Sequence, residues 1–369
     1  MANKKVKVGV VGCGAICGIY LKNMTASRYV EVVACADILP ERAQVAAQKY
    51  GVARACSVKE LLADPEIAIV VNLTIPKAHA DIAFQAVEAG KSIYNEKPIT
   101  ITREDGKRLL KDAKAKKLLV GGAPDTFLGA GLQSCRKLID DGVIGRPIAA
   151  TAFMLCHGHE SWHPDPVFYY KAGGGPMFDM GPYYITALVH LMGPVRKVAG
   201  MTGRALNERL ITSEPKKGTV MTVDVPTHVA GTLEFANGAI AMVIQSFDVW
   251  GHNLPRIEIY GTEGSLSVPD PNTFGGTIKV KLGASKEWIE KPLTHGNAEN
   301  SRGIGIADMS LSLRKRSRKF RASGELCYHV LDVMQGFYDA SDKGKHIVMK
   351  SKCVQPRLLP AGLPDGELD

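Results

Sequence analysis

The sequence predicts an α/β protein with a helix-covered parallel sheet in its N-terminal domain and a C-terminal α+β domain that has a large, mostly antiparallel open sheet. Short apolar runs alternate with helical patterns in the first third of the chain, and longer β-rich runs follow Gly122. Such alternation is typical of parallel sheets wrapped by helices. Because 369 residues are long for one core, we expect two domains, residues 1–124 and 125–369.

The first domain is expected to have five strands with helices between them. The predicted strands are Val6–Val11, Val30–Ala36, Ile67–Leu73, Ser92–Asn95 and Leu118–Gly122. The predicted helices are Ala15–Met24, Pro40–Tyr50, Ser57–Ala63, Pro76–Ala89 and Arg103–Lys116. Several of these helices are preceded by Ser or Thr or begin with Pro, which favour helix starts.

The second domain is expected to place helices on one face of its sheet or at the domain junction. Its predicted strands are Ile148–Leu155, Val195–Arg204, Thr227–Phe235, Ala239–Phe247, Arg256–Tyr260 and Thr277–Leu282. Asn237-Gly238 is a strong hairpin signal between two of them. The predicted helices are Leu128–Asp141, Phe178–Leu191 and Ser323–Ala340, and polar loops are expected at 206–218 and 269–276. The other sheet face is available for self-association, so we expect a homo-oligomer.

Composition argues against several classes of protein. Every apolar run is far shorter than the roughly 20 residues that span a bilayer, and the N-terminus lacks the apolar core of a signal peptide. We therefore expect no membrane partner and a cytoplasmic location. The eight cysteines are scattered without CxxC spacing, which predicts free thiols and no metal site.

The formal net charge of +9 includes one dense basic run at residues 314–321. Such a run can neutralise phosphates. No aromatic stacking pattern or nucleic-acid-binding module accompanies it, so we interpret it as a solvated loop or helix end and expect no nucleic-acid partner.

A glycine turn, Gly12–Cys17, follows the first predicted strand and opens a helix. In a dinucleotide fold the first glycine permits the tight turn and the second lets the backbone approach a pyrophosphate at the helix N-terminus. Gly12 and Gly14 fit these positions, with Ala15 and Ile16 completing the turn. Cys17 occupies the third, small-residue position. The turn predicts a Rossmann domain that binds a nicotinamide dinucleotide.

Asp37 ends the second predicted strand, about twenty residues beyond the turn, where a ribose-binding carboxylate is expected. Such a carboxylate accepts a hydrogen bond from a ribose 2′-hydroxyl and repels a 2′-phosphate. NAD is therefore the preferred cofactor, and NADP remains an alternative because Arg42 lies close in sequence.

Glu96-Lys97-Pro98 follows the strand that ends at Asn95, at the carboxyl edge where parallel sheets bind ligands. A lysine here is placed to bridge a substrate hydroxyl and the nicotinamide. A nearby positive nicotinamide in a partly dry cleft would lower the lysine pKa from about 10.4 and so make it a candidate base.

A second motif, Gly173–Tyr184, contains three consecutive glycines followed by Asp179 and Tyr183. Residues four apart share one face of a helix. Asp179 would accept a bond from a substrate hydroxyl, and Tyr183 would donate or accept a proton. The glycines would let the backbone approach a ligand closely.

The segment Cys156–Pro164 contains three histidines beside a tryptophan. Their spacing in a Gly- and Pro-containing loop does not favour a metal site. It favours a polyhydroxylated ligand, with a sugar ring stacking on Trp162 and hydrogen bonds from His157, His159 and His163.

Taken in order, these motifs resemble the Gfo/Idh/MocA family of oxidoreductases. The resemblance covers nearly the whole chain and includes the Gly12–Cys17 turn, Thr74-Ile75-Pro76 with His79, Glu96-Lys97-Pro98, and the triple glycine before Asp179. It implies that Thr74, Pro76, His79 and Glu96 belong to the cofactor site. It further implies that Lys97 lies near hydride transfer and that Asp179 binds or orients substrate.

One position departs from the family pattern. Members commonly have histidine four residues after the aspartate, whereas this chain has Tyr183. Three assignments stay open: Lys97 is the base, Tyr183 acts with Lys97 lowering its pKa, or a loop histidine such as His163 substitutes. We favour Lys97 as the base with Tyr183 as its hydrogen-bonding partner.

The expected reaction is oxidation of a secondary hydroxyl of a sugar, polyol or glycoside, with ring carbon 3 of a glucoside among the candidates. Two other classes would use the same residues. One is redox-assisted cleavage in which tightly held NAD is regenerated, and the other is a non-catalytic sensor of dinucleotide and sugar.

Overall fold

The computed structural model describes residues 4–283, 285–315 and 317–369, which form two compact units. The first unit comprises the chain up to Gly129 together with His295–Tyr328 and Leu359–Asp369. The second comprises Ala130–Thr294 and His329–Leu358. The linear division at residue 124 therefore describes only part of the organisation. Residues 295–328 return to the first unit because helix α9 (Ile304–Arg314) packs against its strands and helix α1.

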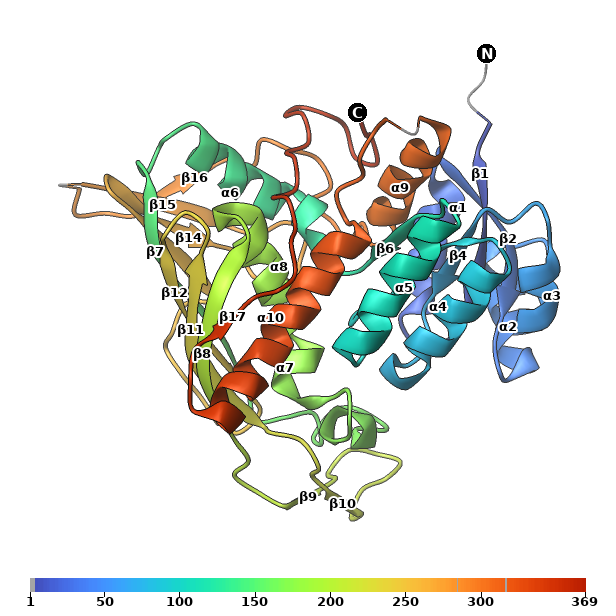
Figure 1. Cartoon of the computed structure of the whole chain (residues 1–369), viewed down its shortest axis with the longest axis horizontal. Helices are drawn as coiled ribbons and strands as arrows, with labels where there is room; N and C mark the ends of the chain where they lie inside the picture. Colours follow the sequence, from blue (N-terminus) through green and yellow to red (C-terminus); the bar gives the residue numbers. More distant parts are fainter. Residues whose placement is uncertain (1–3, 284, 316) are drawn as a thin grey trace. The chain divides into compact units, whose positions relative to one another are not determined.

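The first unit contains a six-stranded parallel sheet in the order β3-β2-β1-β4-β5-β6, which confirms the predicted Rossmann fold (Figure 1). The strands are β1 Val6–Val11, β2 Val30–Ala36, β3 Ala55–Cys56, β4 Ile69–Asn72, β5 Ser92–Asn95 and β6 Val120–Gly122. The order reverses between β1 and β4, so the ligand crevice of this sheet is expected at their carboxyl ends.

Helices connect these strands. They are α1 Cys17–Ala26, α2 Pro40–Tyr50, α3 Val58–Ala63, η1 Pro76–Ala78, α4 His79–Glu88, α5 Arg103–Ala115 and η2 Thr126–Leu128. The Ser57 hydroxyl caps α3 by accepting a hydrogen bond from the Glu60 amide, and the Glu60 carboxylate accepts one from the Ser57 amide. This reciprocal pair satisfies two amides that a helix start leaves unpaired.

The second unit contains a nine-stranded sheet in the order β16-β15-β14-β13-β7-β12-β11-β8-β17. Only the β7–β12 pair is parallel among the described pairs, which confirms the mostly antiparallel prediction. The strands are β7 Pro147–Leu155, β8 Val195–Gly203, β11 His228–Phe235, β12 Ile240–Ser246, β13 Ile257–Gly261, β14 Gly264–Val268, β15 Ile278–Leu282, β16 Ile289–Lys291 and β17 Ile347–Val348.

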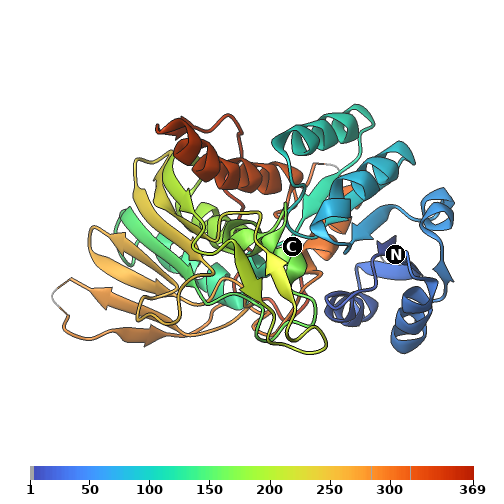
Figure 2. The same ribbon diagram turned by 90° about the horizontal axis from the view of Figure 1, so that it is seen from below.

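Helices cover one face of this sheet (Figures 1 and 2). They are α6 Ala130–Asp140, α7 Gly175–Asp179, α8 Gly181–Met192 and most of α10 Gly324–Lys343, and the short helix η3 Val167–Tyr170 packs against α7. The expected single helix over 178–191 is wrong, because α7 ends before Met180 and α8 begins after it. Pro182 has no N–H with which to continue the ladder of α7, and proline disfavours helical geometry at the preceding residue.

Part of the expected loop at 206–218 is a strand. Strand β9 (Glu208–Leu210) pairs antiparallel with β10 (Val220–Thr222) in a separate two-stranded sheet. Arg209, the central residue of β9, is buried and has a relative exposure of 4%.

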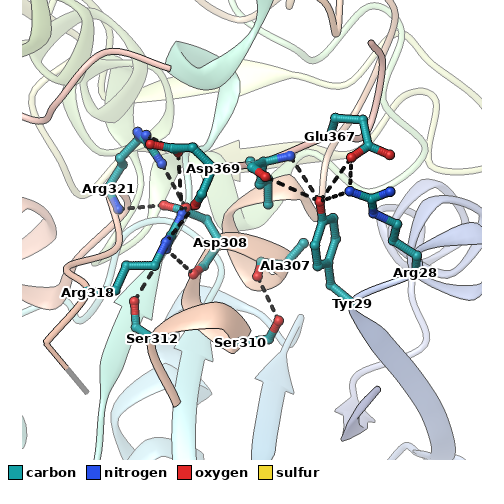
Figure 3. A network of polar contacts seen from close by, with 11 residues as sticks. Arg28, Tyr29, Ala307, Asp308, Ser310, Ser312, Arg318, Arg321, Glu367 and Asp369 are labelled. Atoms are coloured by element: carbon teal, nitrogen blue, oxygen red, sulfur yellow. Dashed lines mark hydrogen bonds and ion pairs between the residues drawn. The ribbon is translucent and has the colours of Figure 1, made fainter. Parts of the chain in front are cut away.

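Arg318 and Arg321 of the basic run make contacts within the first unit (Figure 3). Arg318 and Arg321 both pair with buried Asp308 and with Asp369. Arg314 donates to the backbone carbonyl of Tyr29. Arg316 lies outside the described residues. Arg318 and Arg321 are therefore part of an internal ion network, whereas Lys315 and Lys319 of the same run are exposed as its charge density suggests.

All eight cysteines are free thiols. Within the described ranges, no helix is long and apolar enough to cross a bilayer. The same ranges contain no group of three or more His, Cys, Asp or Glu side chains arranged to hold a metal ion.

Candidate active site

The glycine turn of the first unit leaves the start of α1 accessible. Gly12 has φ +97°, and a Cβ there would lie 2.7 Å from the backbone of Leu73, so this glycine is required by close packing against the segment after β4. A Cβ on Gly14 would meet nothing within 4 Å. Space is therefore open beside Gly14, next to Ala15, Ile16 and the helix start, where amides lack intrahelical partners.

Asp37 holds the turn in place. Its Oδ2 accepts a hydrogen bond from the Cys13 amide at 2.7 Å, and its Oδ1 accepts one from the Leu39 amide at 2.9 Å. Each carboxylate oxygen can accept a second bond. Asp37 thus fixes the turn against the end of β2 and keeps acceptor capacity for a ribose hydroxyl.

Two buried asparagines connect the ends of β4 and β5. Asn72 and Asn95 are opposite one another in the parallel register, and Asn72 Nδ2 donates to Asn95 Oδ1 at 3.0 Å. Asn72 Oδ1 accepts a bond from the Thr74 hydroxyl at 2.6 Å, while Asn95 Nδ2 donates to the Ile99 carbonyl. These bonds set the path of both segments that leave the sheet at its carboxyl edge.

His79 is fully buried between the same two segments. Its Nδ1 lies 2.7 Å from the Pro98 carbonyl and its Nε2 lies 3.0 Å from the Thr74 carbonyl. Burial lowers its pKa, with the two carbonyls acting in the opposite direction. A neutral imidazole has one N–H and can donate to only one of these oxygens. In this structure His79 braces the Thr74–Pro76 segment against Glu96-Lys97-Pro98.

Glu96 is buried and fixes the backbone before the lysine. Its Oε1 accepts a hydrogen bond from the Tyr20 hydroxyl of α1 at 2.7 Å, and its Oε2 accepts one from the Lys97 amide at 2.8 Å. Lys97 itself is partly exposed. The turn helix and the lysine segment are therefore joined through one carboxylate.

In the second unit, Asp179 pairs with His159. The His159 Nε2 and Asp179 Oδ2 atoms are 3.0 Å apart, and both side chains are about one-tenth exposed, 11% and 12%. His159 Nδ1 is buried and has no hydrogen-bond partner among the described residues. A carboxylate that holds one ring nitrogen fixes the orientation of the imidazole, and the second nitrogen keeps its hydrogen-bonding capacity.

Aromatic rings surround this histidine. The ring of Tyr169 is 4.2 Å away, that of Phe247 is 4.6 Å away and that of Trp162 is 5.2 Å away, all in edge-on geometry. Tyr183 lies near the start of α8 and is 6% exposed. The helix break at Met180 means that Asp179 and Tyr183 do not share one regular helix face.

The remaining loop candidates differ in their surroundings. The ring of His157 stacks on Trp250 with centroids 3.3 Å apart. His163 Nδ1 accepts a bond from the Asp165 amide, and burial lowers its pKa. Trp162 is 61% exposed. Of the three loop histidines, the structure brings His159 to the aspartate.

The triple glycine has a packing role. A Cβ on Gly174 would lie 2.5 Å from the Tyr169 carbonyl, and one on Gly175 would lie 2.8 Å from the Pro226 carbonyl. The close approach at these two glycines is therefore to the protein's own backbone, where we had expected a ligand.

Buried charged side chains hold the histidine loop in place through Glu160. Arg209 donates to Glu160 at 2.5 Å and also to Asp248, and the Tyr170 hydroxyl donates to Glu160. Burial alone would raise the pKa of Glu160, but the bonds from Tyr170 and Arg209 lower it overall, so the carboxylate stays ionised.

Sequence reasoning missed Tyr20, Asn72, Asn95 and Arg209. The asparagines had a usable signal, since each is the last residue of a strand next to a motif. Arg209 had none, because it lies in a segment of polar loop composition.

Two family models match the chain. The model of the oxidoreductase family with an NAD-binding Rossmann fold matches residues 6–122, and the Gfo/Idh/MocA C-terminal domain matches residues 132–267. The chain belongs to the Gfo/Idh/MocA family. Its first unit is the NAD-binding Rossmann domain of that oxidoreductase family.

Curated relatives act on sugars and polyols. The chain is 30% identical over 249 residues to levoglucosan dehydrogenase of Pseudarthrobacter phenanthrenivorans, a match that spans 63% of each protein. It is 27% identical over 289 residues to the NAD-dependent scyllo-inositol 2-dehydrogenase of Bacillus subtilis, covering 77% of this chain and 80% of that enzyme. A solved structure of levoglucosan dehydrogenase with NADH has the same fold, with a TM-score of 0.80, 22% identity, and coverage of 95% and 100% of the two chains.

The residues of the first unit fit the dinucleotide. The space beside Gly14 lies at a helix start, which suits a pyrophosphate, and Asp37 retains acceptor capacity for a ribose.

Proposed function

We propose that this protein is a dehydrogenase that uses NAD to oxidise a secondary hydroxyl of a sugar, polyol or glycoside. The observation that carries the substrate assignment is the Asp179–His159 pair in its aromatic surroundings. Carboxylate and imidazole groups bind hydroxyls, and aromatic faces suit the apolar side of a sugar ring. The names of the curated relatives support the same substrate class.

NAD is proposed over NADP because Asp37 would repel a 2′-phosphate. Gly12, Gly14, Ala15 and Ile16 would hold the pyrophosphate at the start of α1. Thr74 and Pro76 would line the adjacent wall, and His79 and Glu96 would position that wall and the lysine. The bound cofactor supplies the hydride acceptor.

Lys97 is proposed to take the hydroxyl proton, with Tyr183 as its hydrogen-bonding partner. Asp179 would orient the substrate hydroxyls, with His157, His159, Trp162 and His163 contacting the sugar. His159 is a second candidate for the proton acceptor, because Asp179 holds its Nε2 and its Nδ1 is not used by a described residue.

The test is the formation of NADH, followed at 340 nm, with a panel of inositols, aldoses and glucosides. We expect Lys97→Ala to lower the rate by about 10²–10⁴-fold, the range for loss of a general base. Lys59→Ala removes an exposed lysine of α3 and serves as the matched control. Substrate consumption without net NADH would replace the proposal with redox-assisted cleavage.

We also propose a cytoplasmic homo-oligomer. The eight free thiols suit a reducing compartment. On the sheet face away from the helices, Met201, Ile240 and Met242 are 78%, 55% and 50% exposed. A second copy of this chain would cover that apolar strip. Light scattering should give a multiple of the 39.7 kDa chain mass, and Met242→Lys should shift it toward the monomer.

A further inference from the structure

Three thiols lie together at the glycine turn of the first unit. Cys13 belongs to the turn, Cys17 is the first residue of α1, and Cys35 is the next-to-last residue of β2. The Cys13 Sγ lies 3.6 Å from the Ala36 carbonyl oxygen, at the end of β2. The thiols of Cys17 and Cys35 both hydrogen-bond to the Cys13 thiol. The turn, the helix and the strand thus bring three sulfurs together.

The surroundings of Cys13 favour its ionised form. Hydrogen bonds from the Cys17 and Cys35 thiols lower the pKa of Cys13, against burial and the nearby Asp37 carboxylate. The bond to Cys13 raises the pKa of Cys17 and of Cys35, and burial raises the pKa of the other five cysteines, all of which lie within the described ranges.

Cys13 is also the accessible member of the cluster. It is partly exposed, whereas Cys17 and Cys35 are 2% and 0% exposed. Thiolates at helix N-termini react readily with peroxides, and redox-sensitive cysteines are accessible, of low pKa and next to a second thiol. Cys13 meets all of these conditions.

The cluster is part of the dinucleotide site. The Cys13 amide donates to Asp37 Oδ2 at 2.7 Å, the carboxylate that would bind the ribose. Residues 14–16 separate Cys13 from Cys17, and the open space beside Gly14 suits the pyrophosphate. A disulfide brings two Cβ atoms to about 4 Å, whereas residues four apart on a helical turn are separated by roughly 5–6 Å. A bond between Cys13 and Cys17 would therefore tighten this turn.

We propose that Cys13 is a site of reversible oxidation, at which hydrogen peroxide converts Cys13 and Cys17 into a disulfide that weakens dinucleotide binding. The structure shows the reduced form, in which the cysteines are free thiols. This site lies in the NAD-binding unit and goes beyond the proposed function.

The oxidation has two steps. The Cys13 thiolate attacks one oxygen of the peroxide, the O–O bond breaks, and hydroxide leaves and takes a proton from solvent, so that Cys13 becomes a sulfenic acid. The Cys17 sulfur then attacks the Cys13 sulfur, the S–O bond breaks, and the oxygen leaves as water with the Cys17 proton. Two thiols are oxidised, and one peroxide is reduced to two waters.

The first test treats the full-length apoprotein with hydrogen peroxide, blocks the remaining thiols and maps disulfides by mass spectrometry. We expect Cys13 bonded to Cys17, and both thiols restored by dithiothreitol. Cys17→Ser and Cys17→Ala should each stop Cys13 at the sulfenic acid, which dimedone traps, and thermal melts check that both variants fold. Cys353→Ser removes a partly exposed thiol of the second unit and is the matched control, which should form the same disulfide.

The second test measures NADH binding by fluorescence titration. Oxidation should raise Kd by at least about tenfold, the equivalent of one lost hydrogen bond to a charged pyrophosphate. Dithiothreitol should restore the original Kd, and Cys13→Ser should give the same Kd before and after peroxide. By linkage, saturating NADH should disfavour the disulfide in a glutathione redox buffer by the same factor.

Three results would overturn the proposal. Cys13 that is oxidised no faster than Cys353 would reject the reactive thiol, and a bond from Cys13 to Cys35 would reject Cys17 as its partner. An unchanged Kd after complete disulfide formation would reject the effect on the dinucleotide. Failure of the reduced protein to bind NADH would count against the dinucleotide site itself, whereas disulfide mapping tests the cysteines without a cofactor.

Discussion

The carboxyl edge of the first unit and the histidine loop of the second unit both hold candidate site residues, but they hold them differently. Gly12 follows β1, and Asn72 and Asn95 end the neighbouring parallel strands β4 and β5, so sheet register alone brings them together. His159 comes from a loop and Asp179 from the end of a short helix, and side-chain packing decides which histidine reaches the aspartate. The sequence therefore predicts which residues at strand ends lie together, whereas the neighbours of loop residues are known only from the structure.

The largest expected effect tests the loop. As the second candidate for the proton acceptor, His159 is tested by His159→Gln, which in that role should lower kcat by about 10²–10⁴-fold because it removes the ring that Asp179 orients. His163→Gln should lower it by less than about tenfold, since that ring bonds to a local amide. Steady-state NADH formation measures both. A larger effect in His163→Gln would reverse the assignment of the loop histidine.

Asp179→Asn and the double variant Asp179→Asn/His159→Gln test whether Asp179 and His159 act together. If the two side chains act as one unit, the double variant should be little slower than the more damaged single variant. Multiplicative effects would mean that the two residues act independently.

The second unit should lose stability in acid through His329. Its Nε2 accepts a bond from the Val195 amide at 3.0 Å, so the ring must be neutral, and burial lowers its pKa to about 4. Stability from this group is present above the unfolded pKa of about 6.5 and is lost as pH falls toward 4. Relative to His329→Gln, we expect the wild type to lose about 3 kcal/mol over that window.

Urea unfolding at several pH values measures this loss. His346→Gln replaces an exposed histidine and is the control. A wild type and a His329→Gln protein with parallel pH profiles would contradict the prediction.

The first unit should show the opposite pH dependence through Asp125. This carboxyl is 1% exposed and accepts bonds from the Gly303 and Gly305 amides at the start of α9, and burial raises its pKa to about 6. Its protonated form is favoured in the folded state, so this stabilisation is complete below about pH 4 and is lost as pH rises through 6.

Asp125→Asn keeps an acceptor and removes the charge. Relative to this variant, the wild type should lose about 3 kcal/mol of unfolding free energy between pH 4 and 7. The same urea series measures it, and a pH-independent difference between the two proteins would refute the assignment.

The smallest expected effects are on stability and NADH binding, and they differ between Gly12 and Gly14 of the glycine turn. Gly12→Ala should destabilise the apoprotein by about 1–3 kcal/mol, because φ is positive and the Cβ would meet Leu73. Gly14→Ala should change stability by less than about 0.5 kcal/mol, yet weaken NADH binding, because its methyl enters open space beside the helix start. Thermal melts and NADH titration distinguish the two. Unchanged NADH affinity in Gly14→Ala would contradict a pyrophosphate at that place.

The spacing of apolar residues and the positions of turn residues predicted most of the core strands and helices. Strands β1, β2 and β5 and helix α2 lie at their expected bounds, since apolar runs and flanking turn residues agree there. Helix α9 was missed because its buried side includes Asp308 and Ser310, which read as polar in sequence and are buried by the ion network of Arg318 and Arg321. The break at Met180 was missed because the expected helix Phe178–Leu191 ran through Pro182, which has no N–H with which to continue the ladder of α7.

The site was predictable to a similar degree. The roles of Gly12, Gly14 and Asp37 follow from spacing alone and stay consistent with the geometry. The partner of Asp179 did not follow, since three histidines within seven residues of loop carry no period that selects one of them. Its selection depends on the packing of Tyr169 from the nearby helix η3 and of Phe247, which comes from a distant part of the sequence.

Residues 295–328 and 359–369 belong to the first unit, so the chain cannot be cut at one position into two fragments that each contain a whole unit. A fragment ending at residue 129 would contain every strand of the parallel sheet but would lack α9, the helix that packs on it. The complementary fragment would contain α9 without the strands and the helix α1 against which it packs. Expressed separately, neither half should give a soluble product, whereas co-expression of the two halves should restore both units by complementation.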